Sequence, residues 1–196
     1  MVRFTLVAAA LGVAASAPAQ TAPAPAPAPA GGGLLDKAVN RPGTGWSFYG
    51  ANYKAKAATA PGIPGGEAVR VTVSAKGANP WDTGATSDTV KPVGARDTVM
   101  LAVYLRAPDA AETRTVDIPI AVGEAAAPYG VVAQDTAKVG HAWKLFYASG
   151  RASRAYPAGA LRGTVQLAGD RQAVELGPVF LLDMGAGQDP ARLPHN

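Results

Sequence analysis

The fold is indicated most clearly by the stretch Thr98-Val99-Met100-Leu101-Ala102-Val103-Tyr104-Leu105-Arg106. Valine and leucine occupy every second position from Val99 to Leu105, and the residues between them include Tyr104. Side chains alternate between the two faces of a β-strand, so this pattern predicts a strand with one buried face. We expect Tyr104 and Arg106 on the opposite face, which either meets solvent or lines a cleft.

The same period-two pattern recurs along the chain. Pro119 falls inside one of these runs. Because proline has no backbone N–H, we expect this strand at a sheet edge or with a bulge. The predicted strands cover residues 68–75, 98–106, 115–122, 129–134, 161–167 and 174–182.

Helices are disfavoured because 23 glycines and 17 prolines leave few stretches long enough to form one. The turn residues Ala168-Gly169-Asp170-Arg171 are expected to join the last two strands as a tight hairpin. Roughly eight to ten short strands at this spacing predict an all-β domain, a two-sheet β-sandwich of the jelly-roll type.

The first part of the chain has the pattern of an export signal. Arg3 precedes an apolar stretch at residues 6–15, and Ala17-Pro18-Ala19 offers small residues for cleavage. Alternating alanine and proline, followed by glycines, predict an extended tether. We therefore expect an exported protein, located in the periplasm, in the cell envelope or outside the cell. The predicted divisions are a signal peptide at 1–19, a linker at 20–33, the β-sandwich at 34–186 and a tail at 187–196.

Composition excludes several classes of protein. Cysteine is absent, which excludes disulfides and cysteine-based metal or nucleophile chemistry. The formal net charge is +4 and the basic residues are scattered, so no nucleic-acid partner is expected. The apolar stretch at residues 6–15 is too short to cross a bilayer, and no later segment is long and apolar enough, so no membrane span is expected.

A large aromatic residue stands between two predicted strands, in Asn79-Pro80-Trp81-Asp82. The indole is flanked by side chains that accept and donate hydrogen bonds. This arrangement suits a sugar, which has apolar C–H faces and hydroxyl edges. The alternative, from these four residues alone, is a core tryptophan between two turns, because most aromatic burial reflects packing.

Several landmarks follow one another in a fixed order along residues 46–183. They are Gly66-Glu67-Ala68-Val69-Arg70-Val71, Asn79-Pro80-Trp81-Asp82, Leu105-Arg106-Ala107, Pro128-Tyr129, Trp143-Lys144-Leu145-Phe146-Tyr147, Val165-Gln166-Leu167 and Gln172-Ala173-Val174-Glu175-Leu176-Gly177. In their number and order they resemble the cellulose- and xylan-binding jelly-roll group of carbohydrate-binding modules, which are similar in fold to galactose-binding domains.

The resemblance implies binding of a polysaccharide or oligosaccharide without cleavage, at a concave sheet face or a loop edge, and no catalytic residues. Such modules often accompany glycoside hydrolases. No catalytic domain follows here, so any partner hydrolase is expected to be a separate chain. The group also often holds a structural calcium ion near the first and last strands, where Asp36 and Asp183 are candidate ligands. No other cofactor is expected.

Six side chains are candidates for binding the glycan, because aromatic rings stack on sugar rings while Arg and Gln hydrogen-bond to vicinal hydroxyls. Gln172 has the parity of the apolar stripe that follows it, so it is also a candidate for a buried glutamine bonded to the backbone. Trp46, Trp143 and Phe146 are expected in the core. The six candidates are Trp81, Arg106, Tyr129, Gln134, Gln166 and Gln172.

Two other functions stay open: a small glycoside hydrolase or polysaccharide lyase on the same fold, and a structural envelope protein that has lost its ligand. The sequence has 14 carboxylates, and a glycosidase needs two that flank the bond. A serine hydrolase would have to use His141, because His195 falls in the predicted tail. The G-x-S-x-G motif, the phosphate-binding loop and the paired-histidine zinc pattern are all absent from the sequence.

Overall fold

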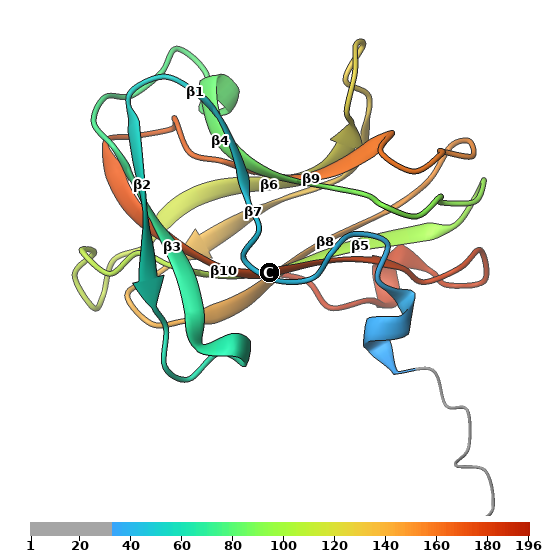
Figure 1. The fold of residues 1–196 in the computed structure, drawn as a ribbon, viewed down its shortest axis with the longest axis horizontal. Helices are drawn as coiled ribbons and strands as arrows, with labels where there is room; N and C mark the ends of the chain where they lie inside the picture. Colours follow the sequence, from blue (N-terminus) through green and yellow to red (C-terminus); the bar gives the residue numbers. More distant parts are fainter. Residues whose placement is uncertain (1–32) are drawn as a thin grey trace, which may run out of the picture. The chain divides into compact units, whose positions relative to one another are not determined.

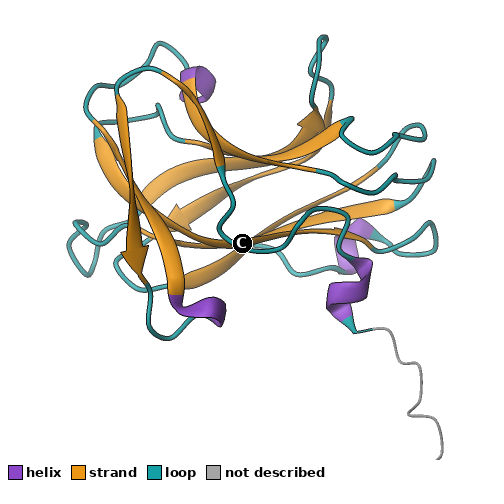
Figure 2. Ribbon diagram, in the orientation of Figure 1, coloured by secondary structure: helices purple, strands orange, loops and turns teal. Residues whose placement is uncertain are grey.

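The protein is described by a computed structural model that covers residues 33–196. These residues form two five-stranded antiparallel sheets, and the helices among them are short 3-10 turns outside the strands (Figure 2). The sheets stack as two layers around a shared core (Figure 1). The prediction of an all-β, two-sheet β-sandwich is therefore confirmed. The predicted signal peptide and residues 20–32 of the predicted linker lie outside the described residues.

The chain changes sheet at most of its connections. Within the described residues, only β2–β3 and β6–β7 join consecutive strands of one sheet. The first sheet has the order β1 (Ser47–Gly50), β4 (Thr83–Asp88), β9 (Leu161–Gln166), β6 (Val116–Glu124) and β7 (Val131–Val139). The second has the order β2 (Tyr53–Thr59), β3 (Glu67–Val73), β10 (Gln172–Asp183), β5 (Thr98–Arg106) and β8 (Lys144–Arg151). The 3-10 helices are η1 (Leu34–Lys37), η2 (Pro64–Gly66), η3 (Pro80–Asp82) and η4 (Pro190–Arg192).

The core lies between the inner faces of the two sheets. The valine and leucine stripe of β5 is fully buried there, as the sequence predicted, and Tyr104 and Arg106 lie on the outer face of the strand. Met100 shares that outer face but is buried as well, because it packs with Ala38 and Leu182. The stripe consists of Val99, Leu101, Val103 and Leu105, which meet Ile118, Ile120 and Val122 of β6 in one cluster.

Of the two alternatives predicted for the strand with Pro119, a sheet edge or a bulge, the structure shows the second. This strand is β6, which lies between β9 and β7. Pairing between β6 and β9 begins at Ile120, so Pro119 is paired only on the β7 side, and the ladder tolerates its missing N–H. A register shift of β6 against β7 between Val122 and Gly123 marks the bulge.

The hairpin predicted at residues 168–171 is also wrong. These residues do turn sharply between β9 and β10. However, β9 pairs with β4 and β6, whereas β10 pairs with β3 and β5. The turn therefore carries the chain from one sheet to the other, which turn residues alone do not distinguish from a hairpin.

Both ends of the described chain are bonded to the sandwich. Asn40 links the sheets, because its amide nitrogen donates to Ser87 Oγ at 3.0 Å and its oxygen accepts from Leu181 N at 2.9 Å. At the other end, the Asn196 side chain bonds both the N–H and the carbonyl of Tyr147, at 2.8 and 3.0 Å. The segment predicted as a tail thus packs against β8. No helix within residues 33–196 is long and apolar enough to cross a membrane.

Candidate functional site

Trp81 is held out from the protein on a single turn of helix, η3. Asp82 stabilises the turn, because its carboxylate accepts the Asn79 N–H at 2.9 Å while its own N–H donates to the Asn79 carbonyl at 3.1 Å. The Pro80 carbonyl accepts a bond from Ala168 N at 3.0 Å, which ties the turn to the β9–β10 connection. Trp81 is 57% exposed. The alternative that the sequence left open, a tryptophan buried in the core, is therefore wrong.

A cleft of about 580 Å³ lies beside Trp81, on the outer face of the β1-β4-β9-β6-β7 sheet. Figure 1 shows η3 and the β6–β7 hairpin rising on the same side of this sheet. Trp81 on η3 and Tyr129 on the hairpin, 66% exposed, form two aromatic walls. The remaining lining residues are Tyr49, Thr86, Ala121, Gly123, Glu124, Val131, Arg162, Thr164 and Gln166.

The floor of the cleft is polar and follows the register of the sheet. Thr86 of β4 lies opposite Thr164 of β9, which in turn lies opposite Ala121 of β6 and then Gln134 of β7. Neighbouring strands are about 4.8 Å apart, so this row places hydroxyl and amide groups at short intervals across the sheet. Gln166 lies in the next row, opposite Gly84.

Tyr129 has an unusual backbone conformation. Its φ is +60°, in the left-handed region that a bulky residue adopts rarely. The turn holds it there through bonds from Tyr129 N to Ala126 O at 2.9 Å and from Glu124 N to Gly130 O at 2.8 Å. Strained residues of this kind cluster at binding and active sites, which makes Tyr129 a site candidate on independent grounds.

Tyr49 of β1 lies over Gly84 of β4. A Cβ atom on Gly84 would be 2.6 Å from the Tyr49 hydroxyl oxygen, so only glycine leaves room for the ring. Burial raises the pKa of Tyr49, nearby Arg162 lowers it and Asp82 raises it. A tyrosine hydroxyl is ordinarily protonated at neutral pH and the net increase in pKa does not change this, so Tyr49 can donate a hydrogen bond inside the cleft.

Two charged side chains line the cleft, Arg162 and Glu124. Glu124 is paired with Arg154 at 2.8 Å, and this hydrogen bond is the main reason that the pKa of Glu124 is lowered. Arg162 has a longer contact, 3.3 Å from its Nε to Asp88 Oδ1. Glu124 is thus closely paired with Arg154, whereas Arg162 is less closely paired with Asp88.

The structure brings four of the six predicted binding residues together. Trp81, Tyr129 and Gln166 line the cleft itself. Gln134 lines an adjoining hollow of about 320 Å³ that shares Trp81 and Gln166 with the cleft and also contains Asp135. The two hollows share four lining residues and are together called the groove: Trp81, Ala121, Val131 and Gln166.

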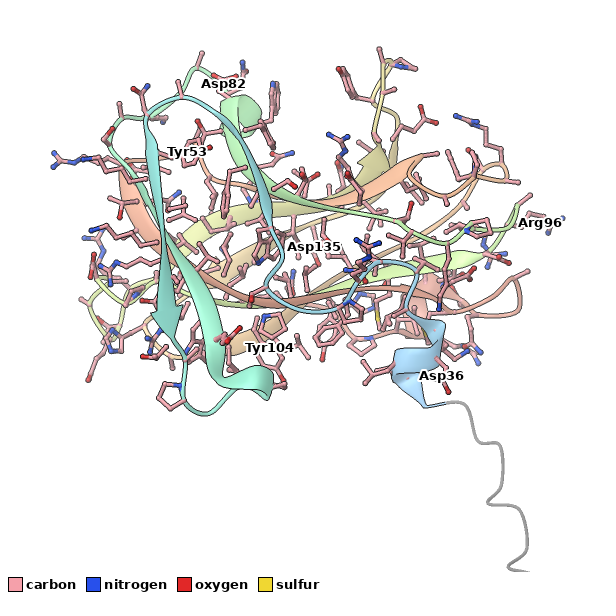
Figure 3. The ribbon with its side chains drawn as sticks, in the orientation of Figure 1. Asp36, Tyr53, Asp82, Arg96, Tyr104 and Asp135 are labelled. Atoms are coloured by element: carbon pink, nitrogen blue, oxygen red, sulfur yellow. The ribbon has the colours of Figure 1, made fainter. Side chains whose placement is uncertain are left out.

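The other two candidates, Arg106 and Gln172, lie elsewhere. Arg106 is on the outer face of β5 in the second sheet, where its Nε bonds Glu175 Oε2 at 2.7 Å and its guanidinium covers the Trp143 ring at 4.8 Å. Figure 3 shows Tyr104, which shares this face, on the opposite side of the sandwich from Asp82 of η3. Gln172 donates to Leu167 O at 2.9 Å, which matches the backbone-bonded alternative.

Sequence reasoning predicted Trp81, Tyr129 and Gln166 and missed the other residues that line the cleft, of which three illustrate the signal that was or was not present. Arg162 and Thr164 share the parity of Gln166 on β9, so the choice of Gln166 already implied them. Tyr49 left no signal, because β1 is four residues long and shows no alternation of apolar and polar residues.

The carboxylates considered for calcium lie away from the cleft. Asp36 and Asp183 line a separate hollow of about 530 Å³, together with Asp97, which was not predicted. Burial and then the neighbouring Asp97 raise the pKa of Asp183, although the Gly185 N–H lowers it. Two close carboxylates provide the oxygen ligands that Ca²⁺ prefers. Within residues 33–196, however, no three His, Asp or Glu side chains are grouped closely enough to hold a metal, so backbone oxygens would have to complete the site.

Comparison with solved structures shows a fold shared with carbohydrate-binding modules. A CBM4 structure aligns with a TM-score of 0.54 and 22% identity, over 71% of this chain and 94% of that one. The N-terminal cellulose-binding domain of Cellulomonas fimi β-1,4-glucanase C aligns with a TM-score of 0.51 and 22% identity, over 74% and 91%. Arabinose-bound MgGH51 α-L-arabinofuranosidase aligns with a TM-score of 0.50 and 15% identity, over 76% and 26%. No protein-family model matches the chain, and no curated protein matches it.

Proposed function

We propose that this protein binds a polysaccharide or oligosaccharide without cleaving it, in the cleft on the outer face of the β1-β4-β9-β6-β7 sheet. One observation carries the proposal: two exposed aromatic side chains, Trp81 and Tyr129, stand over a floor of hydroxyl and amide groups. Aromatic rings bind the C–H faces of sugars, and the floor groups bind their hydroxyls. An exposed apolar pair of this kind has no packing role that would explain it.

The fold supports the same class of ligand. The aligned domains are named as a CBM4 structure and as a cellulose-binding domain, and each is matched over more than nine tenths of its own length. Fold alone does not determine function, so the proposal depends on the residues of the cleft.

Binding without catalysis agrees with the charges in the cleft. A glycosidase needs a carboxylic acid with a raised pKa and a second carboxylate across the bond. Glu124 lines the cleft, whereas Asp135 lines only the adjoining hollow. The pKa of Glu124 is lowered by Arg154, which favours the ionised form. Ionised Glu124 can line the cleft, but it is not suited to donate a proton to a leaving group.

The experiment is affinity electrophoresis of the purified protein in gels that contain xylan, β-glucan, mannan or pectin, together with an assay for new reducing ends. We expect retardation in at least one gel and no release of reducing ends. Release of sugar would establish an enzyme instead. Absence of both effects with every glycan would favour a structural envelope protein.

Export and partnership are parts of the same proposal. We infer that the protein is exported, because a glycan-binding protein must meet its ligand outside the cytoplasm and residues 1–19 have the pattern of a signal peptide. N-terminal sequencing of protein recovered from outside the cytoplasm should start near Gln20, whereas an intact Met1 there would contradict export. A glycoside hydrolase is the partner we expect.

A further inference from the structure

Arg162 is the one cationic side chain among the residues that line the cleft. It is on β9, where its register neighbours are Asp88 on β4 and Gly123 on β6. Glycine has no side chain, so the β6 side of Arg162 is left without a neighbouring side chain at that position. The Arg162 side chain is 33% exposed, which makes it accessible from the cleft yet partly desolvated.

The charge of Arg162 is poorly compensated. Its ion pair within residues 33–196 is with Asp88, at 3.3 Å, whereas charge-assisted hydrogen bonds are usually about 2.7–2.9 Å long. The Arg162 Nε atom is buried and makes no hydrogen bond in this part of the chain. The Asp88 side chain is 54% exposed, so its own charge is largely satisfied by water.

Glu124, the carboxylate of the cleft, has its charge closely compensated. Glu124 is 14% exposed at its side chain and is bonded by Arg154 at 2.8 Å. Arg154 in turn lies over the Tyr156 ring at 4.5 Å, which fixes its position. Glu124 therefore adds little negative potential to the cleft. Asp135 lines the adjoining hollow and not the cleft, so Arg162 is the less closely paired charge that a ligand meets in the cleft itself.

From this contrast we infer that the cleft selects glycans that carry an anionic oxygen group, and that Arg162 binds this group. The inference rests on the proposed function, since it names the class of glycan that the cleft prefers. A planar guanidinium forms two parallel hydrogen bonds to a carboxylate, the group present in uronic acids. A sulfate ester presents the same anionic oxygens. The Tyr49 hydroxyl, which lies near enough to Arg162 for the guanidinium to act on its pKa, supplies a further donor.

The test measures the affinity of the full chain by titration calorimetry for acidic glycans and for their carboxyl-reduced forms. The probes are oligosaccharides of glucuronoxylan, homogalacturonan and alginate, each before and after reduction. Sulfated carrageenan oligosaccharides and their desulfated form separate a sulfate preference from a carboxylate preference. We expect one charged probe to bind about tenfold or more tightly than its neutral counterpart, with the difference shrinking at high salt.

Three variants assign the preference to Arg162. Arg162→Gln should abolish the difference between charged and neutral probes. Asp88→Asn should increase it, because this variant removes the carboxylate that competes for the guanidinium. Arg171→Gln, an exposed arginine on the β9–β10 turn outside the cleft, makes the same change in net charge and should leave the difference unchanged. Melting temperatures confirm that each variant is folded.

The inference is overturned if the parent binds neutral and charged forms equally, or if folded Arg162→Gln keeps the preference. A loss of preference in Asp88→Asn would overturn it as well, even if Arg162→Gln failed to fold. Binding of neutral glycans alone would remove this inference and leave the proposed function standing. Failure of every glycan, charged or neutral, would remove both.

Discussion

Substitution of Trp81 should weaken glycan binding and leave the stability of the fold nearly unchanged. It is the central aromatic of the groove, shared by the cleft and the adjoining hollow, and it is more than half exposed. We therefore predict that Trp81→Ala weakens glycan binding by about 1–3 kcal/mol, roughly five- to hundredfold, because a stacked aromatic contact is lost. The free energy of unfolding should change by no more than about 0.5 kcal/mol, as at other exposed positions. Titration calorimetry and thermal melting measure the two quantities.

Trp46 provides the opposite case for comparison. It is 9% exposed, and its indole N–H donates to Gly177 O at 3.1 Å. Trp46→Ala should cost about 3–5 kcal/mol of stability, while the folded fraction keeps its affinity. A well-folded Trp81→Ala with the affinity of the parent would exclude Trp81 from the site.

Arg106 lies far from the cleft, so its substitution should affect stability and not glycan binding. It bonds Glu175, a side chain that is buried between Arg106 at 2.7 Å and Arg70 at 3.5 Å. Arg106→Ala should lower the free energy of unfolding by about 1.5–3 kcal/mol, because Glu175 loses its shorter charged hydrogen bond. Glycan affinity should stay within about twofold of the parent. A large loss of affinity with normal stability would instead return Arg106 to the site.

At the scale of the elements, β1 and β4 form one end of the cleft through the close approach of Tyr49 to Gly84. A Cβ on Gly84 would lie 2.6 Å from both the Tyr49 hydroxyl and the Val165 carbonyl oxygen of β9. Gly84→Ala should therefore displace the ring, strain the ladder and cost about 1–3 kcal/mol of stability. Binding should weaken too, and denaturant unfolding together with calorimetry checks both effects.

Gly169 is a matched control for this change, because a Cβ there would meet no atom within 4 Å. Gly169→Ala should leave binding unchanged. Combining Gly84→Ala with Tyr49→Ala shows whether the glycine acts through the ring. If it does, the two losses of affinity are not additive, and additive losses would contradict the arrangement.

At the scale of the whole molecule, Asp183 lies in a hollow where segments far apart in the sequence meet. It lies at the end of β10, and its hollow is also lined by Asp36 near the start of the domain and by Asp97 before β5. Burial raises the pKa of Asp183 above the ordinary value of about 3.9. The folded protein thus binds this proton more tightly than the unfolded chain does. The contribution of Asp183 to stability is present at low pH and is lost as the pH rises through the raised value.

We therefore predict that Asp183→Asn, measured in chelator, flattens the decrease in melting temperature between about pH 4 and pH 7. The asparagine keeps an oxygen for the bond from Gly185 N, which is 2.9 Å long in the parent. If a calcium ion binds here, adding Ca²⁺ at pH 7 should raise the melting temperature of the parent and not that of the variant. An identical response of both proteins to Ca²⁺ would contradict a site at Asp183.

The sequence by itself determined the class of fold and most of the strands whose apolar stripes face the core, although β8, with Phe146 and Ala148 buried there, was not predicted. The stripe of β5 was predicted at its full length, because period-two burial leaves a direct trace in the residue order. Strands without that trace were missed. β2 is exposed on both faces and β4 is buried at nearly every position, so neither alternates.

Only the tertiary structure decided which outward residues meet. Parity places Arg106 and Gln166 on the outer faces of their strands equally well, but it does not say to which sheet a strand belongs. β9 joins β4 and β6, which brings Gln166 beside Trp81, whereas β5 joins β10 and β8 on the far side of the sandwich. The site depends on pairing between segments far apart in the chain, and that pairing is set by how both sheets bury their apolar faces together.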